Sequence, residues 1–289
     1  MLVDAAKGLE TQTRKLFEVC SLRKLPTLTF INKMDRPARN PFEICDQIES
    51  EFELETVPMV WPIGDGDRFR GVVDRRSRNV HLYERKDKGA KRLEAETISI
   101  DDGDRVREVL GDALFDQLME DLEILDEVGA QFDRDSFLAG HQTPVFFGSA
   151  FTNFGVELFL NSFLEMGRPP ASRSSTLGII DPNSSDFSGF VFKLQANMDP
   201  KHRDRLAFIR VVSGVFEKGM KVGHSRLPGR RISLSQAQQL FASDRESVTL
   251  AYPGDVVGVN NPGLFAIGDT VFGGTLFLIF WSARHAQEF

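Results

Sequence analysis

The stretch Leu25–Arg36, with the sequence LPTLTFINKMDR, constrains the fold more than any other part of the chain. Its β-branched and apolar residues, Thr27–Ile31, are followed at once by the polar segment Asn32–Asp35. A short apolar run that ends in a polar loop is typical of a buried parallel strand with a binding loop at its carboxyl end. Ligands bind at that end of the strands in open α/β sheets. The stretch therefore predicts an α/β domain with a ligand site directly after residue 31.

The loop Asn32-Lys33-Met34-Asp35 has a chemistry that suits guanine. The Asp35 carboxylate can accept hydrogen bonds from guanine N1–H and from the exocyclic amine, and adenine has no matching pair of donors. Because an unpaired buried carboxylate is unfavourable, one aspartate can reject the wrong base. The Lys33 stem can lie along the base while its ammonium stays hydrated, and Asn32 can tie neighbouring loops together. The alternative interpretation is a solvated turn, and the preceding strand favours the guanine loop.

A second apolar run, Thr143–Phe147, ends in the small residues Gly148-Ser149-Ala150. Small side chains at such a turn let a backbone N–H approach guanine O6. Ser-Ala is common, and taken alone it is better explained by an ordinary strand-to-helix turn. Taken with the first loop, however, the two turns predict a guanine pocket built from Asn32, Lys33, Asp35, Ser149 and Ala150.

Composition sets wider limits on the class of protein. The 289 residues are enough for two domains with a substantial core, and the net charge of −7 argues against general attraction to nucleic acid, though not against local basic patches. Two cysteines, Cys20 and Cys45, have no metal-ligand spacing and predict core thiols of a reducing compartment. The longest apolar run, Leu276–Trp281, is too short to span a bilayer. We therefore expect a cytoplasmic protein with no membrane partner and assign no metal ligand.

Local patterns predict the secondary structure of the first 170 residues. Apolar periodicity predicts helices near residues 11–22, 40–52, 112–128 and 156–166, with inward faces that include Leu16, Phe17 and Cys20 in the first helix and Phe159, Leu160, Phe163 and Leu164 in the last. Alternating segments at 71–74 and 80–83 predict a small antiparallel insertion, whereas residues 59–66 fit no helical pattern.

The second half of the chain has a different period. Residues 171–186 are rich in Ser, Pro and Asn and predict a linker after a first domain of residues 1–170. Residues 187–275 alternate with period two between Gly and Pro turns and predict a small β-barrel. Residues 276–289 do not fit a barrel strand and predict an aberrant or disordered tail.

Several motifs now support a resemblance to a known family. Over Asp4–Gly8, Asn32–Asp35, Trp61–Gly64, Gly148–Ala150 and Phe192–Arg205, the chain resembles the translational GTPases, and among them the family of bacterial peptide chain release factor 3, the class II release factors. Elongation factor G is similar in the guanine loops and barrel, but the run Gln195–Arg205 favours the release factors.

The resemblance implies a fold and a function. The fold is a partial P-loop-type GTPase domain, a mostly parallel sheet with helices, carrying an inserted α+β subdomain at about residues 57–140 and followed by a translation-factor β-barrel. The function is GTP/GDP binding in translation termination, with the ribosome and class I peptide chain release factors as partners.

The resemblance also implies departures from the family. Its phosphate loop, magnesium-binding threonine and Asp-x-x-Gly-His segment precede the strand near Val3, so we expect a chain incomplete at both ends that lacks the Mg²⁺ ligands and hydrolyses no GTP alone. We also expect an apolar, aggregation-prone sheet edge there. One alternative is a nucleotide-independent ribosome- or RNA-binding barrel with Lys201, His202, Arg203 and Arg205 as its contact cluster, which a charged hairpin tip explains equally well. Another is a non-functional fragment.

Overall fold

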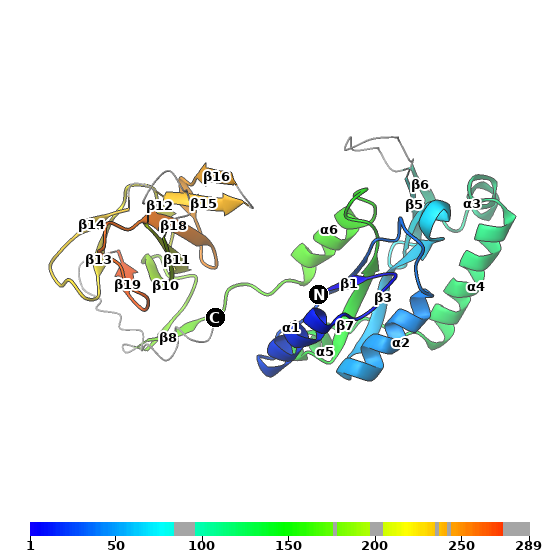
Figure 1. Ribbon diagram of the computed structural model, residues 1–289, viewed down its shortest axis with the longest axis horizontal. Coiled ribbons are helices and arrows are strands. Elements are labelled where there is room, and N and C mark those ends of the chain that lie inside the picture. The colour runs from blue at the N-terminus through cyan, green and yellow to red at the C-terminus, as the bar shows by residue number, and fades with distance from the viewer. Residues whose placement is uncertain (84–95, 176–177, 197–204, 235–236, 242–243, 274–289) are drawn as a thin grey trace. The chain divides into compact units, whose positions relative to one another are not determined.

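The computed structural model describes residues 1–83, 96–175, 178–196, 205–234, 237–241 and 244–273 (Figure 1). The chain divides into two compact units, Met1–Gly167 and Arg168–Phe289. The expected tail at residues 276–289 lies outside the described residues, as do Lys201, His202 and Arg203 of the expected contact cluster. Arg205 is described and begins a strand with its side chain exposed.

The first unit is built on one seven-stranded sheet in the order β1-β2-β7-β3-β4-β5-β6 (Figure 1). Its strands are β1 (Leu2–Asp4), β2 (Thr29–Asn32), β3 (Glu55–Ile63), β4 (Gly71–Asp74), β5 (Asn79–Leu82), β6 (Glu96–Ser99) and β7 (Gln142–Phe147). The pairs β1/β2, β2/β7 and β3/β7 are parallel, and the pairs from β3 to β6 are antiparallel. The expected insertion hairpins therefore continue the main sheet rather than form a sheet of their own.

Helices cover both faces of this sheet (Figure 1). They are α1 (Thr11–Leu22), α2 (Pro41–Phe52), α3 (Gly103–Leu110), α4 (Asp112–Val128), α5 (Arg134–Ala139) and α6 (Val156–Met166), with a 3₁₀ turn at Gly66–Arg68. The fully buried Trp61 of β3 contacts Phe42 of α2 and donates from Nε1 to Asp121 of α4 at 2.9 Å. On the other face, Phe159 of α6 packs against Phe30 and Phe146.

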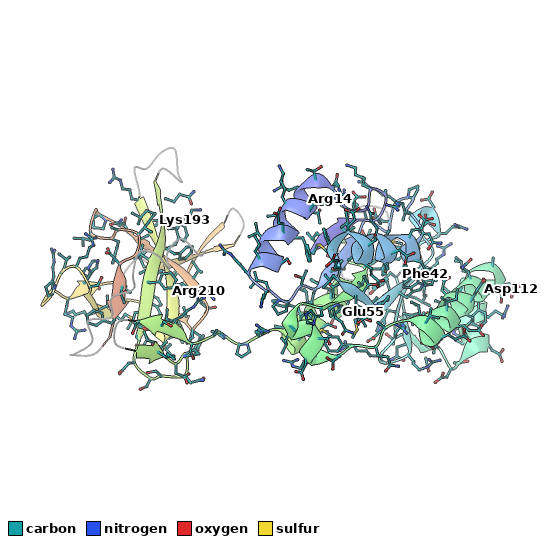
Figure 2. The ribbon with its side chains drawn as sticks, turned by 90° about the horizontal axis from the view of Figure 1, so that it is seen from below. Arg14, Phe42, Glu55, Asp112, Lys193 and Arg210 are labelled. Atoms are coloured by element: carbon teal, nitrogen blue, oxygen red, sulfur yellow. The ribbon has the colours of Figure 1, made fainter. Side chains whose placement is uncertain are left out.

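Local sequence explains where α2 begins and how α1 packs on it. The Asn40 side chain accepts a hydrogen bond from the Phe42 amide at 2.9 Å, which is a helix N-cap, with Pro41 at the first helical position. Arg14 of α1 forms a two-pronged ion pair with Glu51 of α2, at 2.6 and 2.9 Å (Arg14 is labelled in Figure 2).

The central strand β3 was not expected from the sequence. Residues 59–66 fit no helical pattern, and Pro58 and Pro62 argue against an interior strand because proline cannot donate to a sheet. The structure accommodates Pro58 at a register shift between β3 and β7. Val57–Ile63, expected at the start of the insertion, thus lie in the main sheet.

The faces of α1 and α6 also differ from expectation, although both helices have the predicted bounds. No residue of α1 is buried: Leu16 is 58% exposed, and Cys20 is only half-buried, unlike the buried Cys45. In α6 the predicted inward residues Leu160, Phe163 and Leu164 are 51%, 50% and 77% exposed. Apolar periodicity identifies a stripe on a helix but does not show whether another element covers it.

The second unit is a curled antiparallel sheet of eight strands in the order β14-β13-β19-β10-β11-β18-β15-β16. These are β10 (Ser188–Ala196), β11 (Arg205–Ser213), β13 (Lys221–His224), β14 (Ile232–Ser233), β15 (Ala237–Phe241), β16 (Asp244–Ser247), β18 (Val256–Asn260) and β19 (Thr270–Phe272). Two small two-stranded sheets accompany it: β12 (Phe216–Glu217) with β17 (Leu250–Ala251), and the hairpin of β8 (Arg173–Ser175) with β9 (Gly178–Ile180), the latter inside the expected linker. The long strands β10 and β11 carry Lys193 and Arg210, labelled in Figure 2.

A buried charged cluster lies in this second unit. His224, 1% exposed, places Nε2 3.0 Å from Oδ2 of Asp269, and its Nδ1 accepts from the Arg226 amide at 3.1 Å. The Arg226 guanidinium pairs with both oxygens of Asp269. Burial lowers the pKa of His224 below its ordinary value, against the opposing effect of the Asp269 charge. Burial would raise the pKa of Asp269, but hydrogen bonds from Arg226 and from the Ala266 amide outweigh it and lower that pKa.

We expect the free energy of unfolding to fall as the pH drops below the ordinary His224 pKa of 6.5. Just below pH 6.5 the unfolded chain binds a proton at His224 more readily than the folded unit does, so the free energy of unfolding rises with pH. The Asp269 contribution is lost only at a pH below 3.8, outside this window. Chemical denaturation at pH 7 and pH 5.5 should show a smaller pH effect for His224→Gln than for the wild-type chain. The exposed-site variant His141→Gln should keep the wild-type pH effect; an unchanged effect in His224→Gln would contradict the assignment.

The exposed apolar surface of α1 and β1 predicts self-association. Leu2, Leu16 and Leu22 are 66%, 58% and 80% exposed. β1 is the end strand of the sheet, so among the described residues one of its edges has no neighbouring strand. The double variant Leu16→Glu/Leu22→Glu should raise several-fold the protein concentration at which association appears in sedimentation velocity. Gln12→Glu/Ser21→Glu adds the same charge at exposed polar positions of the helix and should have a smaller effect. Equal effects of the two double variants would show that charge, not apolar area, controls association.

Candidate functional site

The two predicted binding turns lie side by side at the carboxyl ends of β2 and β7. The strands pair in parallel with Phe30 opposite Phe146 and Ile31 opposite Phe147, so they end at the same level. Backbone hydrogen bonds then connect the turns: the Gly148 amide donates to Ile31 O at 3.0 Å, and the Met34 amide donates to Gly148 O at 3.1 Å. The turns thus form one continuous rim rather than two separate loops.

Asn32 joins the two turns through its side chain. Its Oδ1 accepts from the Ala150 amide at 2.9 Å and from its own neighbour, the Lys33 amide, at 2.8 Å. A side chain that accepts from two backbone amides in different turns fixes their separation. The predicted role of Asn32 as a tie between loops therefore has a direct structural counterpart.

Gly148 allows the turns to approach this closely. A Cβ at this position would lie 2.2 Å from the Phe154 carbonyl oxygen and 2.9 Å from the Phe30 ring. Both distances are shorter than any normal contact, and the first involves backbone that cannot move aside. The glycine in Gly148-Ser149-Ala150 is thus required by packing at the junction.

Lys33 lies in the left-handed region at φ 74°, which turns its side chain back toward β1. Its ammonium is 2.6 Å from Oδ2 of Asp4, and its side chain is 45% exposed. The amides of Ala6 and Lys7 donate to Oδ1 of Asp4 at 2.9 and 3.1 Å. Burial would raise the pKa of Asp4, but the Lys33 ammonium and these two amides lower it below its ordinary value. Asp4 therefore stays ionised and holds Lys33 at the rim.

Asp35 follows in the same turn, which the backbone fixes from two sides. The Arg36 amide donates to Lys33 O at 3.0 Å, and the Gly66 amide donates to Met34 O at 2.8 Å. Asp35 is half-buried as a residue, and its Oδ1 atom is shielded from solvent. A carboxylate on a fixed, partly dehydrated turn discriminates strongly between partners with and without matching donors.

The turn after β7 is closed on itself. Ser149 and Phe154 form an isolated antiparallel bridge, with amide-to-carbonyl distances of 2.9 and 3.0 Å. The Ser149 side chain is fully buried, whereas Ala150 is exposed at the tip. The backbone of Ser149 is therefore held in place, and the exposed Ala150 follows it directly.

A cavity of about 330 Å³ lies near the first turn, between α2, β3 and α4. Met34 lines it, together with polar side chains that pair with one another. Asp65 accepts from the Ala38 amide and from Arg68, and Asp121 accepts from Trp61 and Gln117. Because these carboxylates already have donors, we assign the cavity no ligand.

The described part of the chain offers no group of three or more His, Cys, Asp or Glu side chains placed to hold a metal ion. Within the same part of the chain, no helix has the length and hydropathy needed to cross a membrane.

Comparison with known proteins places this chain in a family. Residues 1–169 match the model of the elongation factor Tu GTP binding domain, and residues 186–274 match that of elongation factor G domain 2. The chain belongs to the family of the elongation factor Tu GTP-binding domain. The expected fold class, a GTPase-type α/β domain followed by a barrel-like domain, is thereby confirmed.

Similar curated proteins support a narrower relationship. A protein named Peptide chain release factor 3 from Microcystis aeruginosa is 58% identical over 95% of this chain, and one of the same name from Acaryochloris marina is 59% identical over 95%. The chain spans about half the length of these relatives, 50% in each case. The expected resemblance to the release factor 3 family is confirmed.

A solved structure supports the fold alone. A crystal structure of a Thermus thermophilus protein aligns with a TM-score of 0.65 at 17% identity, covering 100% of this chain and 42% of the other.

Sequence reasoning missed two residues that shape the site. In the sequence, Asp4 was noted only as part of the motif Asp4–Gly8. Nothing in its local pattern indicated that it would pair with Lys33. Tyr83, whose hydroxyl accepts from the Gly155 amide, was expected only as part of a strand. Both contacts join residues far apart in sequence, so only the sheet order could have indicated them.

Asn32→Ala should loosen the rim by removing the acceptor shared by the Lys33 and Ala150 amides. A hydrogen bond contributes roughly 1 kcal/mol net, so exchange of the Ala150 amide with deuterium should accelerate about fivefold. Asn32→Asp keeps an acceptor oxygen at the same place and should retain most of the protection. Equal exchange rates at Ala150 in the wild-type chain and Asn32→Ala would contradict the role of Asn32.

Proposed function

We propose that this chain carries the guanine-recognition part of a GTP-binding translation termination factor. One observation supports this most strongly: Oδ1 of Asn32 holds the Ala150 amide at 2.9 Å, which brings the turn of Asp35 and the turn of Ser149–Ala150 to one rim. The Watson–Crick edge of guanine carries donors at N1 and the exocyclic amine beside an acceptor at O6. This arrangement offers a carboxylate on one turn for the donors and the Ala150 amide on the other turn for O6.

In this proposal the two turns contact different atoms of the base. Asp35 accepts from guanine N1–H and the exocyclic amine, and Lys33, held by Asp4 at 2.6 Å, supports the face of the base with its stem. Guanine O6 accepts from the Ser149–Ala150 turn, where the Ala150 amide can share its proton between O6 and Asn32, since three-centre hydrogen bonds are common.

The relatives' name extends the proposal to the longer protein. We infer that it binds GTP and GDP with Mg²⁺, acts on the ribosome in the cytoplasm, and removes class I peptide chain release factors after peptide release. The support is 57–59% identity to proteins named Peptide chain release factor 3 over 95% of the chain.

We assign a separate function to each of the expected domains. Residues 1–170 recognise the nucleotide, with the insertion, expected at about 57–140, following β3. Residues 171–186 link the two domains, and residues 187–275 form the ribosome-docking barrel. Arg205, exposed at the start of β11, together with Lys201, His202 and Arg203, is the proposed contact cluster.

Asp35→Asn tests the guanine assignment. Wild-type chain should bind GDP more tightly than ADP in isothermal titration calorimetry. An asparagine amide offers a donor where the carboxylate accepted, so the variant should lose at least tenfold in GDP affinity, since a hydrogen bond to a charged group contributes about 1.5–3 kcal/mol. It should gain affinity for xanthosine diphosphate, whose carbonyl replaces the exocyclic amine.

Asp46→Asn provides the matched control, because it removes the same charge from an exposed position on α2. It should bind GDP like the wild-type chain. A wild-type chain that binds ADP as tightly as GDP, or an Asp35→Asn variant with unchanged preference, would refute the proposal.

A further inference from the structure

The turn of Ser149 and Ala150 is held from outside the two binding loops by Tyr83, which directly follows β5. The Tyr83 hydroxyl accepts a hydrogen bond from the Gly155 amide at 3.0 Å. Its ring stacks on Phe154, with centroids 4.2 Å apart and planes 14° from parallel. Phe69, at the start of the same hairpin, adds a second ring contact to Phe154 at 5.9 Å. Tyr83, at the end of the β4–β5 hairpin, thus contacts two consecutive residues of the loop, Phe154 and Gly155.

Phe154 and Gly155 are connected to the tip of the turn through backbone hydrogen bonds. Phe154 forms both backbone hydrogen bonds of the bridge to Ser149, and Ala150 is the next residue. Gly155 has φ 73°, and a Cβ there would lie 2.6 Å from the Phe147 carbonyl oxygen, so this end of the loop is seated tightly on β7. Because the loop is short and closed, a change in the contacts of Phe154 and Gly155 with Tyr83 should also shift Ser149 and Ala150.

Tyr83 is itself fixed on the sheet. Its amide donates to the Arg70 carbonyl at 3.0 Å, which continues the pairing of β4 and β5. Its side chain is half-buried, and burial raises the pKa of the phenol above its ordinary value. The hydroxyl therefore remains protonated at neutral pH and is available as an acceptor for Gly155. Tyr83 is thus held by the sheet and contacts the short loop between Ser149 and Gly155.

We propose that Tyr83 is a positioning residue for base recognition: through Gly155, Phe154 and the bridge to Ser149 it sets the place of the Ala150 amide that meets guanine O6. This inference rests on the proposed guanine-binding function. It makes the β4–β5 hairpin, which lies outside both binding loops, a determinant of nucleotide affinity. Tyr83 acts through the loop and does not touch the base.

Tyr83→Phe tests this proposal because it removes one hydroxyl and keeps the ring that stacks on Phe154. Affinities for three nucleotides should be measured by calorimetry: GDP, inosine diphosphate and 2-aminopurine riboside diphosphate. GDP and inosine diphosphate both carry O6, so the variant should lose about three- to tenfold for each, with the ratio between them unchanged. 2-Aminopurine lacks O6, so its affinity should change by less than twofold.

Tyr252→Phe is the matched control, since it makes the same chemical change at an exposed tyrosine of the second unit. It should bind all three nucleotides as the wild-type chain does. Amide exchange gives a second readout that needs no ligand: the Gly155 and Ala150 amides should exchange several-fold faster in Tyr83→Phe, while the amides of α2 keep their wild-type rates.

The outcomes separate the two proposals. If the wild-type chain binds GDP no better than ADP, the proposed function fails and this inference fails with it. If the wild-type chain selects guanine but Tyr83→Phe binds GDP as Tyr252→Phe does, only the role of Tyr83 is refuted. An equal loss for all three nucleotides, with faster exchange throughout the first unit, would show general destabilisation and would likewise overturn the role.

Discussion

The parallel pairing of β2 with β7 in a single register is the constraint on which the site depends. It places Ile31 opposite Phe147, so the polar turns that follow both strands emerge at one level. A shift of one residue would exchange the two faces of a strand and separate the turns. The buried Thr29 and Thr143 hydroxyls, 2.8 Å apart at the other end of these strands, help to fix the same register.

The rim is then stiffened by contacts from three directions. β1 supplies Asp4 to Lys33, the turn after β3 supplies the Gly66 amide to Met34, and the β4–β5 hairpin supplies Tyr83 to Gly155. Each contact is modest alone, because net contributions of hydrogen bonds are about 1 kcal/mol. Together they hold the backbone in place before any ligand arrives, which reduces the ordering that binding would otherwise require.

Local chemistry in the sequence was sufficient for some of this account. The run before Asn32 and the run before Gly148 predicted the two strands, and Asn40 predicted where α2 begins. β3 was missed because its two prolines are locally typical of a loop, whereas the structure places Pro58 at a register shift against β7 and Pro62 opposite Val72 of β4. The ties from Asp4 and Tyr83 join residues 29 and 72 positions apart, and no local pattern encodes such distances.

The most direct test of the account is a titration followed by nuclear magnetic resonance of the backbone amides, first with GDP and then with ADP. If both turns face one guanine, GDP should shift the Lys33–Asp35 and Ser149–Ala150 amides together, at the same nucleotide concentration, and ADP should leave them nearly unchanged. Shifts confined to one turn, or equal shifts with ADP, would contradict a guanine site shared by the two turns.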